Sequence, residues 1–78
     1  MNIPDQLLLD ISTELDEATA TNAPFHSAHE GYAVILEEVD ELWDEIKKKP
    51  ANRNTIEMRK EAIQVAAMAI RFIMDGGL

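Results

Sequence analysis

Residues 36–45 of the chain read LEEVDELWDE. Carboxylates occupy six of the nine positions from Glu37 to Glu45, yet apolar residues still recur at helical spacing. Because positions three and four apart are neighbours on a helix, Glu38, Glu41 and Glu45 form one ridge. This ridge borders the apolar stripe that we expect to face the core, which consists of Tyr32, Ile35, Val39, Leu42 and Ile46. The remaining acidic residues point more nearly toward solvent, and these are Glu37, Asp40 and Asp44. We therefore expect function at the ridge that borders the core.

The length of the chain limits it to one domain, spanning residues 1–78. A chain this short buries only about 60% of its unfolded surface, and small folds often gain stability from disulfides, metals or oligomerisation. There is no cysteine, which excludes disulfides and thiolate metal sites. Carboxylate-bound metal and self-association both stay open.

The net charge of −8 argues against binding to nucleic acid or to an anionic membrane surface, since both need basic surface. A phosphate substrate would also be repelled unless a divalent cation stands between it and the carboxylates. No apolar run approaches the roughly 20 residues that span a bilayer, and the N-terminal residues lack the pattern of a signal peptide. We expect a soluble, cytoplasmic protein.

Turn and capping signals predict an all-α protein with three helices, at residues 3–21, 28–48 and 55–75. Pro4 suits the first turn of the first helix, and Pro24 lies in the break that follows it. Ser27 and Glu30 match a capping box at the start of the second helix. Gly31 lies early in this helix, where it costs about 1 kcal/mol relative to alanine, and a glycine at such a position can allow a close approach of another backbone.

The second helix is expected to end at the basic run 47–49 before Pro50, because positive charge favours a helix C-terminus and proline stops the helix. A phosphate contact is the other interpretation of this run. Asn54 and Glu57 form a second capping pair, and the glycines at 76 and 77 end the third helix.

The third helix has two apolar faces, nearly opposite each other. One face consists of Met58, Ala62, Val65, Ala69 and Phe72. The other consists of Ile63, Ala67, Ile70 and Met74. A helix that is apolar on both sides is either central or buried against a second chain. With only three helices available, we favour a partner chain for the second face, and so an antiparallel bundle completed by homo-oligomerisation.

A polar ridge separates the two apolar faces of the third helix: Glu57, Glu61, Gln64, Met68 and Arg71 share it. The short loop between the second and third helices predicts antiparallel packing, which can bring Glu38 and Glu41 opposite Glu61 and Gln64. Three carboxylates forced together raise one another's pKa or require a cation. Hard oxygen ligands with room for water suit Mg²⁺, or Mn²⁺, better than zinc. The alternative is a solvated acidic face, which is common on helices.

These residues carry a family resemblance. The pattern Glu37-Glu38-x-x-Glu41 followed by Glu61-x-x-Gln64 resembles the motif of the MazG-like all-α nucleoside triphosphate pyrophosphohydrolases. The surrounding residues 29–36 and 64–72 are most similar to those of the small phage-type members. The resemblance covers about residues 28–75, and the first helix matches only in kind.

The resemblance implies magnesium-dependent cleavage of a nucleoside triphosphate to the monophosphate and pyrophosphate by a homo-dimer or homo-tetramer. By position, it implies that Glu38, Glu41, Glu61 and Gln64 hold the metal and that Glu37 is an accessory acid. The catalytic set is then Glu37, Glu38, Glu41 and Glu61, with Glu37 or Glu41 orienting the attacking water. Gln64 stands where the family usually has aspartate, and an amide brings no charge and cannot act as a base. A metal- or nucleotide-binding helical oligomer with weak or no activity is therefore the alternative function.

Three basic residues of the third helix are candidates to bind the substrate's phosphates: Arg59, Lys60 and Arg71. Arg71 is the best placed because it shares the ridge of Glu61 and Gln64, and its alternative role is an ion pair with Glu57 or Asp75. Trp43 is expected to pack in the core or an interface rather than stack on a base. His26 and His29 are interpreted as loop or cap residues, since no second nitrogen ligand stands at a metal-site spacing.

Overall fold

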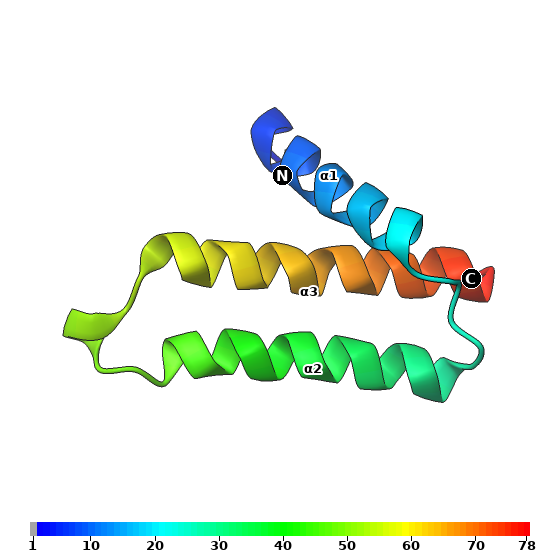
Figure 1. Ribbon diagram of the computed structural model, residues 1–78. Coiled ribbons are helices and arrows are strands. Elements are labelled where there is room, and N and C mark those ends of the chain that lie inside the picture. The colour runs from blue at the N-terminus through cyan, green and yellow to red at the C-terminus, as the bar shows by residue number, and fades with distance from the viewer. Residues whose placement is uncertain (1) are drawn as a thin grey trace.

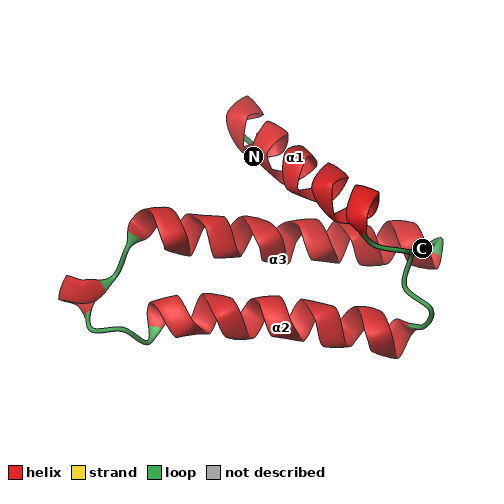
Figure 2. Cartoon of the chain, in the orientation of Figure 1, coloured by secondary structure: helices red, strands yellow, loops and turns green. Residues whose placement is uncertain are grey.

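The computed structural model describes residues 2–78 as three α-helices with one short 3₁₀ turn and no strand among them. The helices are α1 (Asp5–Thr21), α2 (Ala28–Ile46) and α3 (Thr55–Gly76), and the 3₁₀ turn η1 (Pro50–Asn52) joins α2 to α3. Figure 1 follows the chain by residue number, and Figure 2 shows that only short loops separate the helices. The predicted all-α fold is confirmed.

The capping residues identified from sequence begin two of the helices. Ser27 Oγ accepts a hydrogen bond from the Glu30 backbone N–H at 3.1 Å. Asn54 Oδ1 accepts from the backbone N–H groups of Ile56 and Glu57, at 2.9 and 3.2 Å. Each cap satisfies donors that would otherwise lack a partner in the first turn.

The helix boundaries differ from the predicted ones by one or two residues. Pro4 precedes α1 instead of lying within it. α2 ends at Ile46 rather than residue 48, because Lys49 is extended before Pro50 and the Arg53 side chain donates to the Ile46 carbonyl at 2.9 Å. α3 ends at Gly76, one residue later than predicted, and the C-cap residue Gly77 takes the left-handed conformation at φ 66°.

α3 is the central helix. α2 runs antiparallel to it through the η1 connection, and α1 packs obliquely on another side of α3 (Figure 1). This corrects the expectation that Ile63 and Ala67 face a partner chain. Ile63 lines a cleft against α1, and Ala67 is completely buried within the single chain. Ile70 and Met74, on the same predicted face, stay exposed.

Gly31 allows α2 and α3 to pack closely. A Cβ atom at this position would lie 2.5 Å from Phe72 Cδ2 and 3.1 Å from Phe25 Cδ2. The distance to Phe72 is too short for a real Cβ contact and the distance to Phe25 is tight, so the missing side chain leaves the space that the Phe72 ring fills.

The core stripe predicted for α2 is only partly buried. Ile35, Leu42 and Ile46 are half-buried, but Tyr32 and Val39 are 62% and 41% exposed. The prediction was wrong at these two positions because a single neighbouring helix covers a narrower face of α2 than the sequence stripe spans. Asp40 and Asp44 face solvent as expected.

Within residues 2–78, no helix combines the length and the apolar character needed to span a bilayer.

Candidate metal centre

Three carboxylates from two helices meet on one side of the α2–α3 pair. Glu38 and Glu41 come from α2 and Glu61 comes from α3, and one oxygen of each lies within 4.8 Å of those of the other two. Glu38 and Glu61 are half-buried, whereas Glu41 is exposed. The antiparallel packing therefore brings the two acidic ridges together as their spacing predicts.

Burial and crowding raise the pKa of Glu38 and of Glu61. Burial, followed by the charge of Glu41 and a hydrogen bond with it, raises the pKa of Glu38 from its ordinary 4.5 to about 7, with smaller effects of Glu61 and Glu14. Burial and then Glu41 also raise the pKa of Glu61, while Lys60 acts in the opposite direction. Without a bound cation, protonation of a carboxylate removes its negative charge and so reduces the repulsion between these neighbouring acidic groups.

Gln64 adds hydrogen-bond donors to the cluster. With its amide nitrogen turned toward the acids, it donates to Glu38 Oε2 at 3.0 Å and to Glu61 Oε2 at 2.9 Å. This orientation is assigned from the hydrogen-bonding partners, since carboxylates attract an amide N–H and repel its oxygen. The predicted role of Gln64 as an oxygen ligand therefore requires a half-turn of the amide.

A cleft of about 650 Å³ lies beside the cluster, between α1 and the α2–α3 pair. Glu37 lines it but is exposed and stands outside the group of three clustered carboxylates. Glu14 and Glu17 of α1 also line it, and the sequence interpretation had assigned them no role. Their Glu-x-x-Glu spacing, the same as that of Glu38 and Glu41, was a signal that α1 contributes to the acidic surface.

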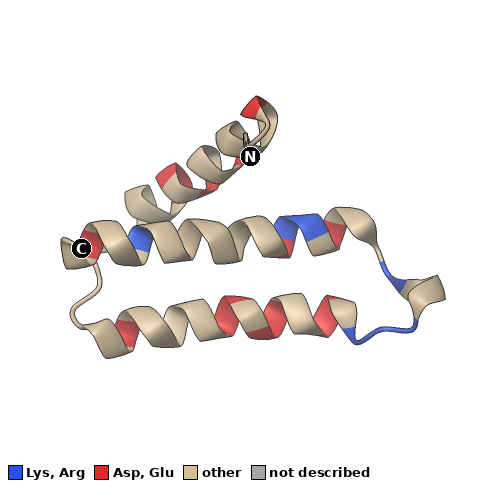
Figure 3. Cartoon of the chain, turned by 180° about the vertical axis from the view of Figure 1, so that it is seen from behind, with Lys and Arg blue, Asp and Glu red and all other residues tan. Residues whose placement is uncertain are grey.

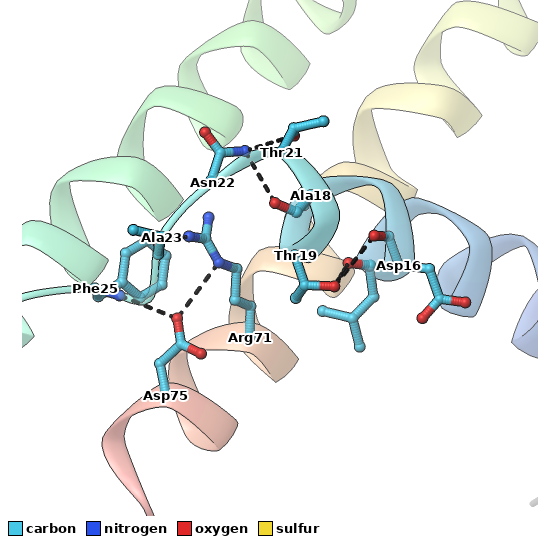
Figure 4. A network of polar contacts seen from close by, with 10 residues as sticks. Asp16, Ala18, Thr19, Thr21, Asn22, Ala23, Phe25, Arg71 and Asp75 are labelled. Carbon is cyan, nitrogen blue, oxygen red and sulfur yellow. Dashed lines mark hydrogen bonds and ion pairs between the residues drawn. The ribbon is translucent and has the colours of Figure 1, made fainter.

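Arg71 lines the same cleft but is only 5% exposed, and its guanidinium contacts the loop between α1 and α2. Its Nη2 donates to the Ala23 carbonyl at 2.6 Å, and its Nε lies 3.4 Å from Asp75 Oδ2. The guanidinium carbon is 4.1 Å from the centre of the Phe25 ring, and the Phe25 N–H donates to Asp75 Oδ2 at 3.1 Å (Figure 4). The structure thus contains the Asp75 ion pair that was the alternative role of Arg71.

Arg59 and Lys60 lie around a second cleft, of about 550 Å³, between α1 and α3. Arg59 Nη2 is 2.8 Å from Asp10 Oδ2, so this side chain joins α3 to α1. Glu14 and Glu17 line both clefts, which therefore adjoin. The structure does not place Arg59 or Lys60 in the cleft that holds Gln64.

The histidines take no part in the cluster. His26 Nδ1 lies 3.0 Å from Glu30 Oε2, in the first turn of α2, and its side chain is largely exposed. Neither His26 nor His29 belongs to a possible metal-binding group within the described part of the chain.

Comparison of the chain with protein-family models, with curated proteins and with solved structures finds no match in any of the three. A functional assignment therefore has to come from the chemistry of the site and from the motif itself.

Proposed function

We propose that the chain is a Mg²⁺-dependent nucleoside triphosphate pyrophosphohydrolase, which converts a (d)NTP and water to the (d)NMP and pyrophosphate. The observation that carries the proposal is the meeting of Glu38, Glu41 and Glu61 within 4.8 Å. The choice of reaction comes from the resemblance of this motif to the MazG-like family. Mn²⁺ is the alternative ion.

The donor set fits a hard divalent cation. Magnesium binds oxygen at 2.0–2.1 Å, so ligands on opposite sides of the ion are about 4 Å apart. The three carboxylate oxygens are within 4.8 Å of one another, and they would have to move closer to share one ion, whose neighbouring ligands are about 3 Å apart. After rotation of its amide, Gln64 would add a fourth, uncharged ligand. The bound ion would neutralise phosphate charge and activate the attacking water.

The chain's own residues supply the surroundings of the reaction. The cleft of about 650 Å³ is in the size range of small-molecule sites. Glu37, which is exposed and lines the cleft, would orient a water molecule. Glu38, whose pKa is raised to about 7, can accept a proton near neutral pH when the cation does not occupy it.

The charge distribution makes a cation necessary for substrate entry. In Figure 3 acidic residues mark all three helices and include several in the C-terminal half of α2, while the basic residues lie on α3 and in the α2–α3 connection. Glu14, Glu17 and Glu37 line the cleft, so a triphosphate enters it favourably only as a metal complex. Arg71 would contact a phosphate by exchanging it for Asp75, and Arg59 and Lys60 would act from the adjoining cleft.

The test is pyrophosphate release from a panel of (d)NTPs in the presence of Mg²⁺. We expect activity in the natural chain and its loss in Glu38→Gln and in Glu61→Gln. Asp40→Asn is the matched control, because it removes one carboxylate from the solvent face of α2. Absence of pyrophosphate release over the whole panel, with Mg²⁺ or Mn²⁺, rules out the proposal.

The second candidate is a metal- or nucleotide-binding helical protein without turnover. The direction of the Gln64 amide favours it, since N–H donors toward Glu38 and Glu61 stabilise the cluster without a cation. This function predicts that Mg²⁺ raises the melting temperature while no nucleotide is cleaved. Activity gained in Gln64→Asp would identify an enzyme limited by its missing fourth carboxylate. In either case we place the protein in the cytoplasm as a homo-oligomer.

A further inference from the structure

The α2–α3 pair carries an uncharged apolar face on the side away from the acidic cluster. On α2, Tyr32, Leu36, Val39 and Trp43 are 62%, 43%, 41% and 56% exposed. Their spacing of four, three and four residues is that of a coiled-coil seam, which places all four on one side of the helix. Within residues 2–78, α3 is the helix in contact with α2, and α1 contacts α3 instead (Figure 1), so no other described helix covers this side of α2.

α3 continues the same face with small residues. Ala62, Ala66, Ala69 and Ile73 repeat the same spacing, and of these only Ala66 is half-buried. Phe72, which contacts α2, separates this row from Gln64 and Met68, which line the acidic cleft. We call the eight residues of the two rows the apolar face, and none of them is charged.

The chain exposes more surface than a closed domain of its size. A compact monomer of this mass has about 4,800 Å² of accessible surface, whereas the chain has 5712 Å². Its radius of gyration is 13.5 Å, against about 11.5 Å for a compact domain of 78 residues. The excess of accessible surface is about 900 Å². This is similar to the area of about 800 Å² that each partner buries in a standard protein–protein interface.

The shapes of the two rows indicate which partner fits. The α2 row presents large side chains, and the α3 row presents three alanines that let a helix approach closely. Because one chain carries both the row of large side chains and the row of small ones, two copies related by a two-fold axis fit each other. The α2 row of each copy then contacts the α3 row of the other. None of the eight residues is charged, so two chains of net charge −8 can meet through this face without bringing its own residues into charge repulsion.

We propose that the apolar face binds a second copy of this chain, with the α2 row of each copy packed on the α3 row of the other in a four-helix arrangement. The proposal is independent of nucleotide hydrolysis. It also moves the interface away from Ile63 and Ala67, where the sequence had indicated it.

The first test is the mass of the purified chain by sedimentation equilibrium at micromolar concentration. We expect a dimer for the natural chain and a monomer for Leu36→Glu, whose dissociation constant rises about 100-fold or more when a charge enters the interface. Leu9→Glu is the matched control, because Leu9 is 58% exposed on α1, outside the apolar face. We expect the Leu9→Glu variant to remain a dimer. A natural chain that is a folded monomer overturns the proposal, and so does a folded Leu36→Glu dimer.

A second test does not depend on whether Leu36→Glu folds. The chain has no cysteine, so Leu36→Cys and Ala66→Cys each introduce a single thiol, at about the same level of the helix pair. On oxidation of the mixed variants we expect the disulfide to join one variant to the other. Disulfides that join only two copies of the same variant, or no disulfide at all, contradict the pairing of α2 with α3.

Trp43 is the chain's one tryptophan and gives a third readout. Its fluorescence emission should shift to longer wavelength when dilution separates the two chains. An emission that stays constant through the dissociation range contradicts the place of Trp43 in the interface.

Discussion

Removing the charge of Glu38 should stabilise the protein at alkaline pH and leave it nearly unchanged at acid pH. The ordinary pKa of glutamate is 4.5, and that of Glu38 in the folded chain is about 7. The folded state therefore holds the proton more tightly than the unfolded state does. It follows that the free energy of unfolding falls as the pH rises from about 4.5 to about 7, and the full deficit is present above that range.

The size of the deficit follows from the shift of the pKa. The change of the Glu38 pKa from 4.5 to about 7 corresponds to about 3 kcal/mol if the group were fully shielded from water. Glu38 is only half-buried and stands beside the open cleft, and solvent screening reduces the effect to about 1–2 kcal/mol. Glu38→Gln resembles the protonated side chain at every pH, so it should recover this amount.

The measurement is urea denaturation of both proteins at about pH 4.5 and about pH 8. We expect Glu38→Gln to be more stable than the natural chain by about 1–2 kcal/mol at the higher pH only. Asp40→Asn removes the same charge from the exposed side of α2 and should change stability by less than about 0.5 kcal/mol at both. Adding Mg²⁺ at the higher pH should stabilise the natural chain more than the variant.

Two results would refute this reasoning. Equal stability of Glu38→Gln and the natural chain at about pH 8 would mean that Glu38 is ionised at no cost in the folded state. An equal gain in Asp40→Asn would mean that the overall charge of −8, rather than the cluster, destabilises the chain.

The remaining predictions concern packing, capping and the loop contact. Gly31→Ala should lower the free energy of unfolding by about 1–3 kcal/mol, because the new methyl group overlaps the Phe72 ring and this outweighs the helix propensity of alanine; a stabilised variant in thermal denaturation would show that the ring moves freely. Asn54→Ala should cost about 1 kcal/mol in urea denaturation through loss of the α3 cap, and an unchanged midpoint would contradict the capping role. Arg71→Met should cost about 2–4 kcal/mol because it leaves Asp75 half-buried without its cation. Arg71→Lys should not restore that loss, since lysine lacks the planar fork that reaches both the loop and Asp75; a fully stable lysine variant would be inconsistent with the contacts of Arg71.

Local signals in the sequence were sufficient for the helices and for the acidic cluster. Ser27 and Asn54 cap the helices they were expected to cap, because capping depends only on residues three or fewer positions away. Glu38 and Glu61 meet because one short connection fixes the antiparallel pairing of their helices.

The position of α1 was not predictable in the same way. Periodicity shows which side of a helix is apolar, but not which neighbour covers it. For this reason the periodicity indicated no role for Glu14 and Glu17, which line the cleft. It also assigned Ala67 to a partner chain, although Ala67 is buried within this chain. The buried contacts of Arg71 depend on the path of a loop far away in sequence, which spacing along α3 does not reveal.

The stretch from Leu36 to Glu45 divides into three faces with different requirements. Glu38 and Glu41 point to the site, the aspartates face solvent, and Leu36 and Trp43 lie on the apolar face. A charge placed on the apolar face and a charge removed from the site therefore test separate properties of one helix, although the two substitutions are only two positions apart. If Leu36→Glu dissociates the dimer and Glu38→Gln changes only the pH dependence and metal binding, the two faces act independently. If each substitution changes both, dimerisation and the acidic site are coupled through the packing of α2 on α3.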